Sequence, residues 1–258
     1  MKAKYQRYPL LFFFVCIGIF EFLYFFPKRL FVLESVAATL VLVSVWRINV
    51  LPIKEKFFSA SYWHFSLPLL FFVVNSILFS IVLERQLYFH VLALFTAFFS
   101  FLYLKYIVIY FRLPLFNDEK ALPNISFFLN TSTVFFLSDS LLAFILLLNL
   151  DVVLSFLIFL AELWLLSFQT LWVSRINPIK ATVYALVITI IFAELFWVFR
   201  FLPLDYTIVA LIMAGFFHLL LNLSVFWIQD LWEFKLVRKY IIIGLVLLFV
   251  VLGTAQWK

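Results

Sequence analysis

The class of fold is decided by residues 206–228, which read YTIVALIMAGFFHLLLNLSVFWI and contain no Asp, Glu, Lys or Arg. A helix needs about 20 apolar residues to cross the hydrocarbon core of a bilayer, and this stretch is long enough. The rest of the chain has the same character, because 67% of its 258 residues are hydrophobic and 12% are charged. Soluble domains average roughly half apolar and a quarter charged. The composition therefore predicts an all-α integral membrane protein.

Other apolar runs of suitable length lie on both sides of this stretch, separated by short connections. None of the connections is long enough to hold a soluble domain. About nine transmembrane helices are predicted, at residues 9–26, 30–46, 62–83, 88–111, 126–149, 152–173, 181–203, 206–228 and 240–256. The last of these runs is the shortest.

Basic residues give the orientation, because Lys and Arg are enriched in the cytoplasmic loops of membrane proteins. Thirteen of them fall on the side of the N-terminus and five on the other side. We therefore expect a cytoplasmic N-terminus and, after nine spans, an external C-terminus, in a bacterial cytoplasmic membrane. The first run lacks a small-x-small cleavage site, so we expect it to be retained. The predicted partner is the lipid bilayer, with other membrane proteins as further candidates and no nucleic acid.

Two short motifs occur twice, about half a chain apart. Arg-Ile-Asn and Pro-Ile-Lys follow the second span and again the sixth, and Glu34 and Glu162 show the same spacing as the two Arg-Ile-Asn motifs. The characteristic positions are Arg47, Asn49, Pro52, Lys54, Arg175, Asn177, Pro178 and Lys180. One interpretation is structural: Arg anchors a helix end at the headgroups, Asn suits the last turn, and Pro prevents the helix from continuing. The other is a binding role for these loops.

The doubled motifs predict two parallel four-helix repeats, related by an axis along the membrane normal, followed by a C-terminal helix. The first repeat would cover residues 1–112 and the second 126–228. A cytoplasmic connector would occupy residues 113–125, and a basic loop with the final span would occupy 229–258. The alternative is coincidence in an apolar sequence of low complexity.

Five carboxylates fall well inside the predicted spans, where ionisable groups are costly and usually face a protein interior or a water-filled cavity. They are Glu21, Glu34, Asp139, Glu162 and Glu194. Counting from the cytoplasmic ends of their helices puts all five at about 20 Å, in the outer half of the bilayer. Asn75 falls in the same layer and aligns with Glu194, while Arg200 and His218 lie nearby in the predicted spans.

This layer has two interpretations. In the functional one, Glu34, Glu162 and Glu194 face the bundle interior and share a polar cavity for a proton, a cation or a polar head group. Arg200 would then reach inward toward Glu194. In the structural one, the acids form hydrogen bonds with neighbouring helices and specify their packing.

Catalytic and metal-binding signatures are absent from the sequence. The chain has one cysteine, Cys16, three widely spaced histidines, and no GxSxG, HExxH or glycine-rich phosphate loop. We therefore expect no metal site, and the sequence leaves the cofactor unknown. A small transporter using the acid layer is the first functional hypothesis, and a non-enzymatic scaffold or subunit of a larger membrane complex is the alternative. An enzyme acting on lipid-borne substrates is the third.

The last third of the chain carries a loose resemblance. Glu194, the run Arg200-Phe201-Leu202-Pro203, the following apolar span and the basic segment before the final helix form the pattern. It resembles uncharacterised polytopic membrane proteins of small-genome, candidate-phylum bacteria. The resemblance implies a polytopic membrane fold and no particular activity.

Overall fold

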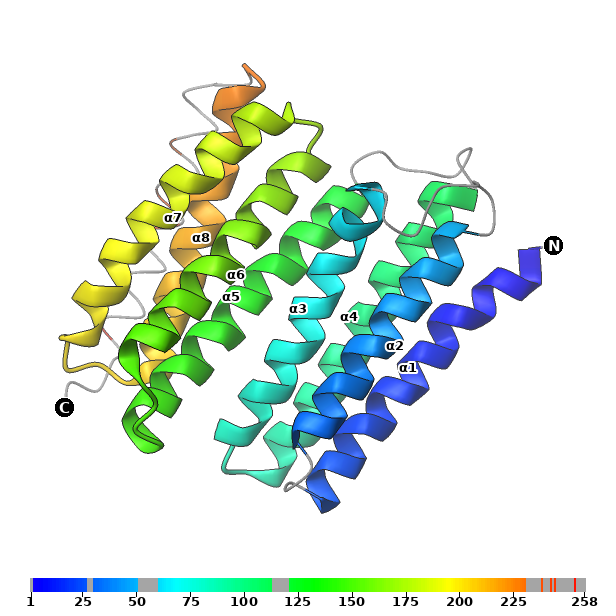
Figure 1. Ribbon diagram of the computed structural model, residues 1–258, viewed down its shortest axis with the longest axis horizontal. Helices are drawn as coiled ribbons and strands as arrows, with labels where there is room; N and C mark the ends of the chain where they lie inside the picture. Colours follow the sequence, from blue (N-terminus) through cyan, green and yellow to red (C-terminus); the bar gives the residue numbers. More distant parts are fainter. Residues whose placement is uncertain are drawn as a thin grey trace. The chain divides into compact units, whose positions relative to one another are not determined.

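The computed structural model describes residues 2–26, 30–50, 60–112 and 121–230, together with Arg238, Ile242, Gly244 and Gly253. Within these ranges the regular structure is entirely α-helical. The helices are α1 (Lys2–Phe25), α2 (Leu30–Val50), α3 (Ala60–Val82), α4 (Gln86–Arg112), α5 (Ala121–Leu147), α6 (Val152–Val173), α7 (Pro178–Arg200) and α8 (Tyr206–Ile228) (Figure 1).

Seven of the described helices are long and apolar enough to cross a membrane, namely α1 and α3 to α8. In α2 the apolar part within the described residues, Val32–Val45, is shorter. These helices confirm the prediction of a polytopic, all-α membrane protein. The predicted ninth span, residues 240–256, lies outside the described residues except for Ile242, Gly244 and Gly253, so the number of nine stays a prediction.

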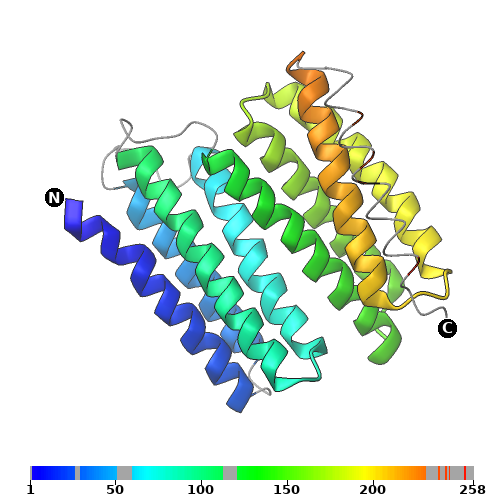
Figure 2. The ribbon, with the colours of Figure 1, turned by 180° about the vertical axis from the view of Figure 1, so that it is seen from behind.

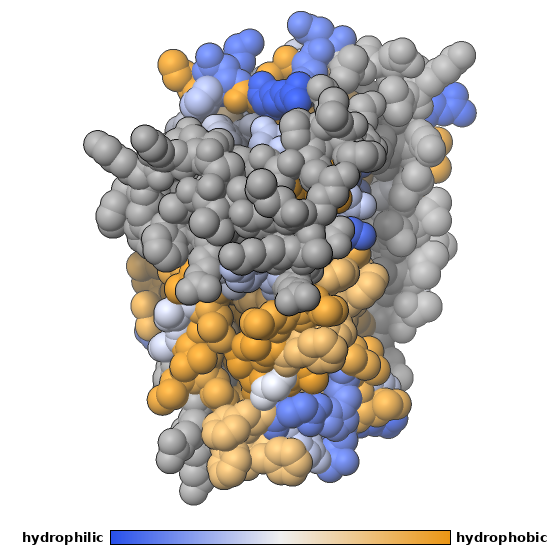
Figure 3. Space-filling model, turned by 90° about the vertical axis from the view of Figure 1, so that its right-hand side faces the viewer, coloured by the Kyte–Doolittle hydropathy of each residue, from blue (hydrophilic) through white to orange (hydrophobic). Residues whose placement is uncertain are grey.

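The surface agrees with a bilayer environment. On the face shown in Figure 3, hydrophobic residues cover the middle of the described surface, and hydrophilic residues gather toward its ends. Large apolar side chains are widely exposed, for example Leu94, Leu157 and Val187, each about half exposed. In water such a surface would drive aggregation, so we conclude that lipid covers it.

The chain divides into two compact units, residues 1–129 and 130–258. In the first unit, α1 packs along α4, α2 packs on α3, and α3 packs on α4 (Figures 1 and 2). The Tyr103 hydroxyl on α4, fully buried, donates a hydrogen bond of 2.9 Å to the Phe65 carbonyl on α3. This bond ties the two helices together where no water is available.

In the second unit, α6 packs along α7, and α8 contacts both. Phe159 on α6, Phe192 and Phe196 on α7 and Phe217 on α8 are all fully buried or nearly so, and their rings contact one another. At one end of this unit, the Gln229 side chain donates to the Ser174 carbonyl at 2.8 Å. The boundary between the units falls within α5, and the predicted repeat boundaries stay a prediction.

The two copies of the Arg-Ile-Asn motif occupy different places in the fold. Asn177 does not end a helix; its side chain accepts the Ile179 N–H at 2.9 Å and caps the start of α7, with Pro178 as the first helical residue. Arg175, just before it, has a left-handed backbone (φ 62°) in the connection after α6. Asn49, by contrast, lies within the last turn of α2. The helix-stop interpretation is therefore wrong for the second copy.

The difference has a physical reason. An Asn side chain can cap a helix N-terminus as well as lie in a last turn, and Pro is favoured at the first helical position because its missing N–H has no intrahelical acceptor there. α7 therefore begins directly after Asn177. α3 begins only at Ala60, well beyond Asn49. Pro52 and Lys54 lie outside the described residues.

Candidate functional site

Helix α5 carries an unusual number of polar side chains for a spanning segment, and most of them are buried. Ser126, Asn130, Thr133, Ser138, Asp139 and Ser140 are each at most 2% exposed. Burying a polar group without a partner is unfavourable, and in a bilayer the surrounding lipid supplies none. The neighbours of these side chains therefore decide what α5 does.

Asn130 is the centre of a hydrogen-bond network between α5 and α6. Its side-chain amide donates to Gln169 Oε1 at 2.6 Å and to Thr170 Oγ1 at 2.7 Å, and it lies 3.4 Å from the Leu166 carbonyl. The Thr170 hydroxyl in turn donates to the Leu166 carbonyl at 2.8 Å. Asn130, Gln169 and Thr170 are almost completely buried. This network links the two helices through buried polar groups.

Asp139 lies on the other side of α5. Nine residues separate it from Asn130, which is about 180° around a helix. Its side chain is 0% exposed, and neither carboxylate oxygen has a hydrogen-bond partner. At the start of α8, the Thr207 side chain interacts favourably with the Asp139 carboxylate, and the negative charge of Asp205 opposes the negative charge of Asp139. A buried carboxylate beside the first turn of another helix is the most unusual feature of the second unit.

Asp205 and Thr207 are positioned by the start of α8. Asp205 is the N-cap residue, and its Oδ1 accepts the Thr207 N–H at 3.1 Å. Acidic N-caps are favoured because they satisfy free N–H groups and complement the helix dipole. Thr207 is exposed, whereas Asp139 is buried.

Glu21, one of the five predicted acids, pairs with a histidine of another helix. Its Oε1 on α1 lies 2.9 Å from Nδ1 of His90 on α4, and both side chains are about two-fifths exposed. The rings of Tyr24 and Phe89 pack against His90. The pair joins the two helices near the ends that lead into the α1–α2 and α3–α4 connections. An exposed pair of this kind adds little stability.

Glu34 and Asn75, the other candidates in the first unit, differ in burial. Glu34 on α2 is half-buried, and its Oε1 is buried without a hydrogen-bond partner. Asn75 on α3 is fully buried and donates 2.9 Å to the carbonyl of Phe71, one turn earlier in its own helix.

The remaining candidates lie in the second unit. Glu162 on α6 is half-buried, whereas Glu194 on α7 and His218 on α8 are exposed. The expected approach of Arg200 to Glu194 is not found. The Arg200 guanidinium lies over the Trp197 ring at 5.7 Å and near the Phe201 ring at 6.0 Å. Six residues turn the helix by about 600°, so positions 194 and 200 face directions about 120° apart.

The acids also differ in their distance from the ends of their own helices. Glu21 and Glu34 lie one turn from the helix ends that meet at the α1–α2 connection, whereas Glu162 lies at the middle of α6, roughly 15 Å from its start. Arg47 and Arg175 differ in their place relative to their helices, since α2 continues past Arg47 while α6 ends before Arg175. A shared cavity of Glu34, Glu162 and Glu194 stays a prediction, since the first lies in one unit and the others in the second.

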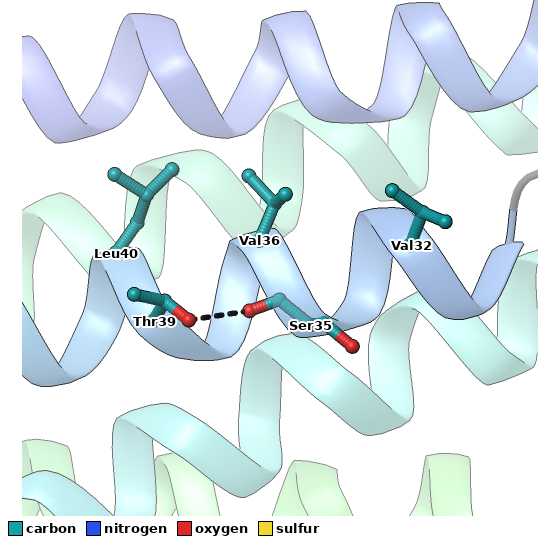
Figure 4. A pocket seen from close by; sticks show the side chains of 5 residues that line it. All are labelled: Val32, Ser35, Val36, Thr39 and Leu40. Carbon is teal, nitrogen blue, oxygen red and sulfur yellow. Dashed lines mark hydrogen bonds between the residues drawn. The ribbon is translucent and has the colours of Figure 1, made fainter.

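A shallow groove of about 560 Å³ follows α2, lined by Val32, Ser35, Val36, Thr39 and Leu40 (Figure 4). The Thr39 hydroxyl donates to the Ser35 carbonyl at 2.8 Å, so that donor is already used within the helix. The remaining lining is mostly aliphatic. The groove therefore has the chemistry of a contact with lipid chains, and it presents no charged group.

Sequence reasoning missed the Asn130 network and the pairing of His90 with Glu21. Asn130, Gln169 and Thr170 are uncharged, and a search for carboxylates and motifs does not select them. A signal was available, since two hydrogen-bonding side chains, Gln169 and Thr170, stand together in an apolar run. Among the described residues no group of three or more His, Cys, Asp or Glu side chains could hold a metal ion.

Comparison with family models, curated proteins and solved structures found no match to the chain.

Proposed function

We propose that this membrane protein is a small transporter that moves a proton or a monovalent cation by means of intramembrane carboxylates. The observation that carries the proposal is Asp139, which is fully buried in a spanning helix with neither oxygen hydrogen-bonded. Intramembrane acids are rare, and they typically mark ion pathways or proton relays. A carboxylate kept only for packing would be expected to have its oxygens satisfied by donors.

The proposal includes the predicted orientation and the predicted repeats. With the N-terminus in the cytoplasm, Asp139 lies in the outer half of the bilayer, because α5 runs outward toward its end at Leu147. A parallel in the two units supports the repeat. Glu21 on α1 meets His90 near the start of α4, and Asp139 on α5 meets Thr207 at the start of α8. Each unit thus brings an acid of its first helix against the start of its fourth.

Flux measurements in liposomes test the proposal. The full chain should exchange protons for sodium or potassium above the background of protein-free liposomes, and Asp139→Asn should reduce this flux to background. The matched control is Asp151→Asn, because Asp151 is exposed and only caps α6 through the Leu154 N–H. Asn is an equally good cap. Transport by this carboxylate is excluded if the wild type shows no flux or if Asp139→Asn retains it.

The alternative is a scaffold that binds other membrane proteins, and the exposed face of α7 favours it. Val187, Ile190, Ile191 and Val198 are exposed there, and Glu194 lies among them. A scaffold would give no flux, and it would co-purify with the same membrane protein in stoichiometric amounts after mild detergent extraction. Asp139→Asn would then leave that association unchanged.

A further inference from the structure

We propose that Arg200, Trp197 and Phe201 form a binding site for the phosphate of an anionic phospholipid. The three residues lie at the end of α7 and in the turn that follows it. All three are exposed, so a lipid head group can reach them. The site is independent of the proposed transport, since it uses none of the residues assigned to ion movement.

The first argument is the way in which the aromatic rings hold Arg200. Its guanidinium lies over the Trp197 ring at 5.7 Å and over the Phe201 ring at 6.0 Å. Attraction to aromatic faces restricts the motion of a guanidinium but uses none of its N–H donors. These donors form a planar fork that matches two oxygens of a phosphate group. The two rings therefore keep Arg200 at the surface with its donors available.

The second argument is the absence of an anion beside Arg200 in the described part of the chain. Within those residues, its side chain forms neither an ion pair nor a hydrogen bond. Glu194 faces about 120° away around α7. Asp205, the next acid along the chain, caps α8 by accepting the Thr207 N–H at 3.1 Å. The counter-charge of Arg200 must therefore come from outside the described residues.

The third argument excludes the helix end as the partner of Arg200. A basic residue in a last turn complements the helix dipole, and its donors can satisfy the last carbonyls. At the end of α7 the backbone already does this, because the N–H groups of Phe201 and Leu202 donate to the carbonyls of Val198 and Phe199, each at 3.2 Å. The guanidinium donors are thus not needed to close the helix.

The fourth argument is the level of Arg200 in the bilayer. The 23 residues of α7 give a length of about 35 Å. The hydrocarbon core is about 30 Å thick, and the polar layers extend it to about 40–45 Å. The last residue of α7 therefore reaches the head groups, where tryptophan is enriched in membrane proteins. With the cytoplasmic N-terminus predicted above, this is the external leaflet.

The charge of Arg200 decides which class of lipid binds best. Both zwitterionic and anionic phospholipids carry a phosphate, but a zwitterionic head group also carries an ammonium group. An unpaired guanidinium repels this second cation, whereas an anionic lipid brings none. The site should therefore prefer an anionic phospholipid.

The first unit contains a similar arrangement. Arg85, directly before α4, lies over the Tyr88 ring at 5.8 Å, and both residues are exposed. In the predicted topology, Arg85 and Arg200 are the two described basic residues on the side opposite the N-terminus. An arginine over an aromatic ring thus recurs on that side, as expected for contacts with the head groups of one leaflet.

Quenching of tryptophan fluorescence by brominated lipids tests the site, with Trp197 as the reporter. The full-length protein is reconstituted in phosphatidylcholine vesicles that contain a small fraction of brominated phosphatidylglycerol or of brominated phosphatidylcholine. The chain has eight Trp, so the Trp197 signal is the difference between the wild type and Trp197→Phe. The anionic lipid should occupy the site about fivefold more readily than the zwitterionic lipid at equal mole fraction.

Three substitutions give the structural test. Arg200→Gln removes the charge and should abolish the preference. Lys180→Gln is the matched control, because it removes one exposed positive charge at the other end of the same helix, and it should keep the preference. Arg200→Lys keeps the charge but loses the planar fork, so it should retain only part of the preference.

The site is overturned if the wild type shows no preference or if Arg200→Gln keeps it. A full preference in Arg200→Lys would also overturn it, because any surface cation would then suffice. Glycerol phosphate, replacing chloride in the buffer at constant ionic strength, separates a lipid site from a site for soluble anions. It should leave the quenching unchanged, and displacement of the brominated lipid would refute the assignment to a lipid.

Discussion

Replacing Asn130 by alanine should lower the free energy of unfolding by about 1–3 kcal/mol. The Asn130 amide makes two short hydrogen bonds, to Gln169 at 2.6 Å and to Thr170 at 2.7 Å. Hydrogen bonds between membrane helices contribute about 0.6 kcal/mol on average and up to about 1.7, so two of them give this range. Thr170 keeps its bond to the Leu166 carbonyl in the variant, which limits the loss.

The assay is unfolding of the full chain in mixed micelles by increasing amounts of denaturing detergent, followed by tryptophan fluorescence. Asn124→Ala is the matched control, since Asn124 lies on the same helix at an exposed position. It should change the free energy of unfolding by less than about 0.5 kcal/mol. Equal effects of the two substitutions, or no effect of Asn130→Ala, would show that the network does not hold α5 against α6.

Three further predictions follow from other parts of the molecule. Glu194→Leu should stabilise the protein in bilayers by about 1–3 kcal/mol, because Glu194 is exposed among apolar residues of a spanning helix; a loss of stability would point to a bound partner. Gly244→Ala should be less stable than Gly253→Ala by about 1 kcal/mol, because both gain helix propensity but a methyl group at 244 would overlap the Leu219 side chain, whereas one at 253 meets no atom within 4 Å. A cysteine replacing Asp118, in a variant without the native cysteine, should resist labelling by an impermeant reagent from outside, and rapid labelling would contradict the cytoplasmic N-terminus.

The membrane fold could be predicted from the sequence because it depends on composition and length alone. An uninterrupted apolar run such as residues 206–228 becomes a spanning helix, since the backbone has no other way to satisfy its polar groups in lipid. α6 and α8 begin and end where the apolar runs predict. Helix ends near polar motifs were harder to predict, since Asn and Pro, as at positions 177 and 178, are favourable both where a helix ends and where one begins.

The candidate site was predictable only in part. Asp139 stands out in the sequence because a charged residue in an apolar run is rare. Its neighbours do not, because Thr207 lies far away in the chain and meets Asp139 only through helix packing. The direction of a side chain also depends on its position around the helix. Arg200 turns toward Trp197 rather than Glu194 for this reason.

The expected layer of acids depended on a second assumption, that basic anchors mark equal depths. Glu34 and Glu162 are equally far from Arg47 and Arg175 in sequence. α2 continues beyond Arg47, however, whereas α6 ends before Arg175. The same spacing is therefore counted from different points relative to the two helix ends, and a common depth of Glu34 and Glu162 stays a prediction.

The central claim is that Asp139 exchanges a proton for a monovalent cation inside the membrane. Infrared difference spectroscopy of the protein in lipid, as sodium replaces choline, measures this directly. The carbonyl-stretch band of a protonated carboxylic acid should decrease as sodium binds, and the decrease should be absent from Asp139→Asn. An unchanged band in the wild type, or the same decrease in Asp139→Asn, would contradict the claim.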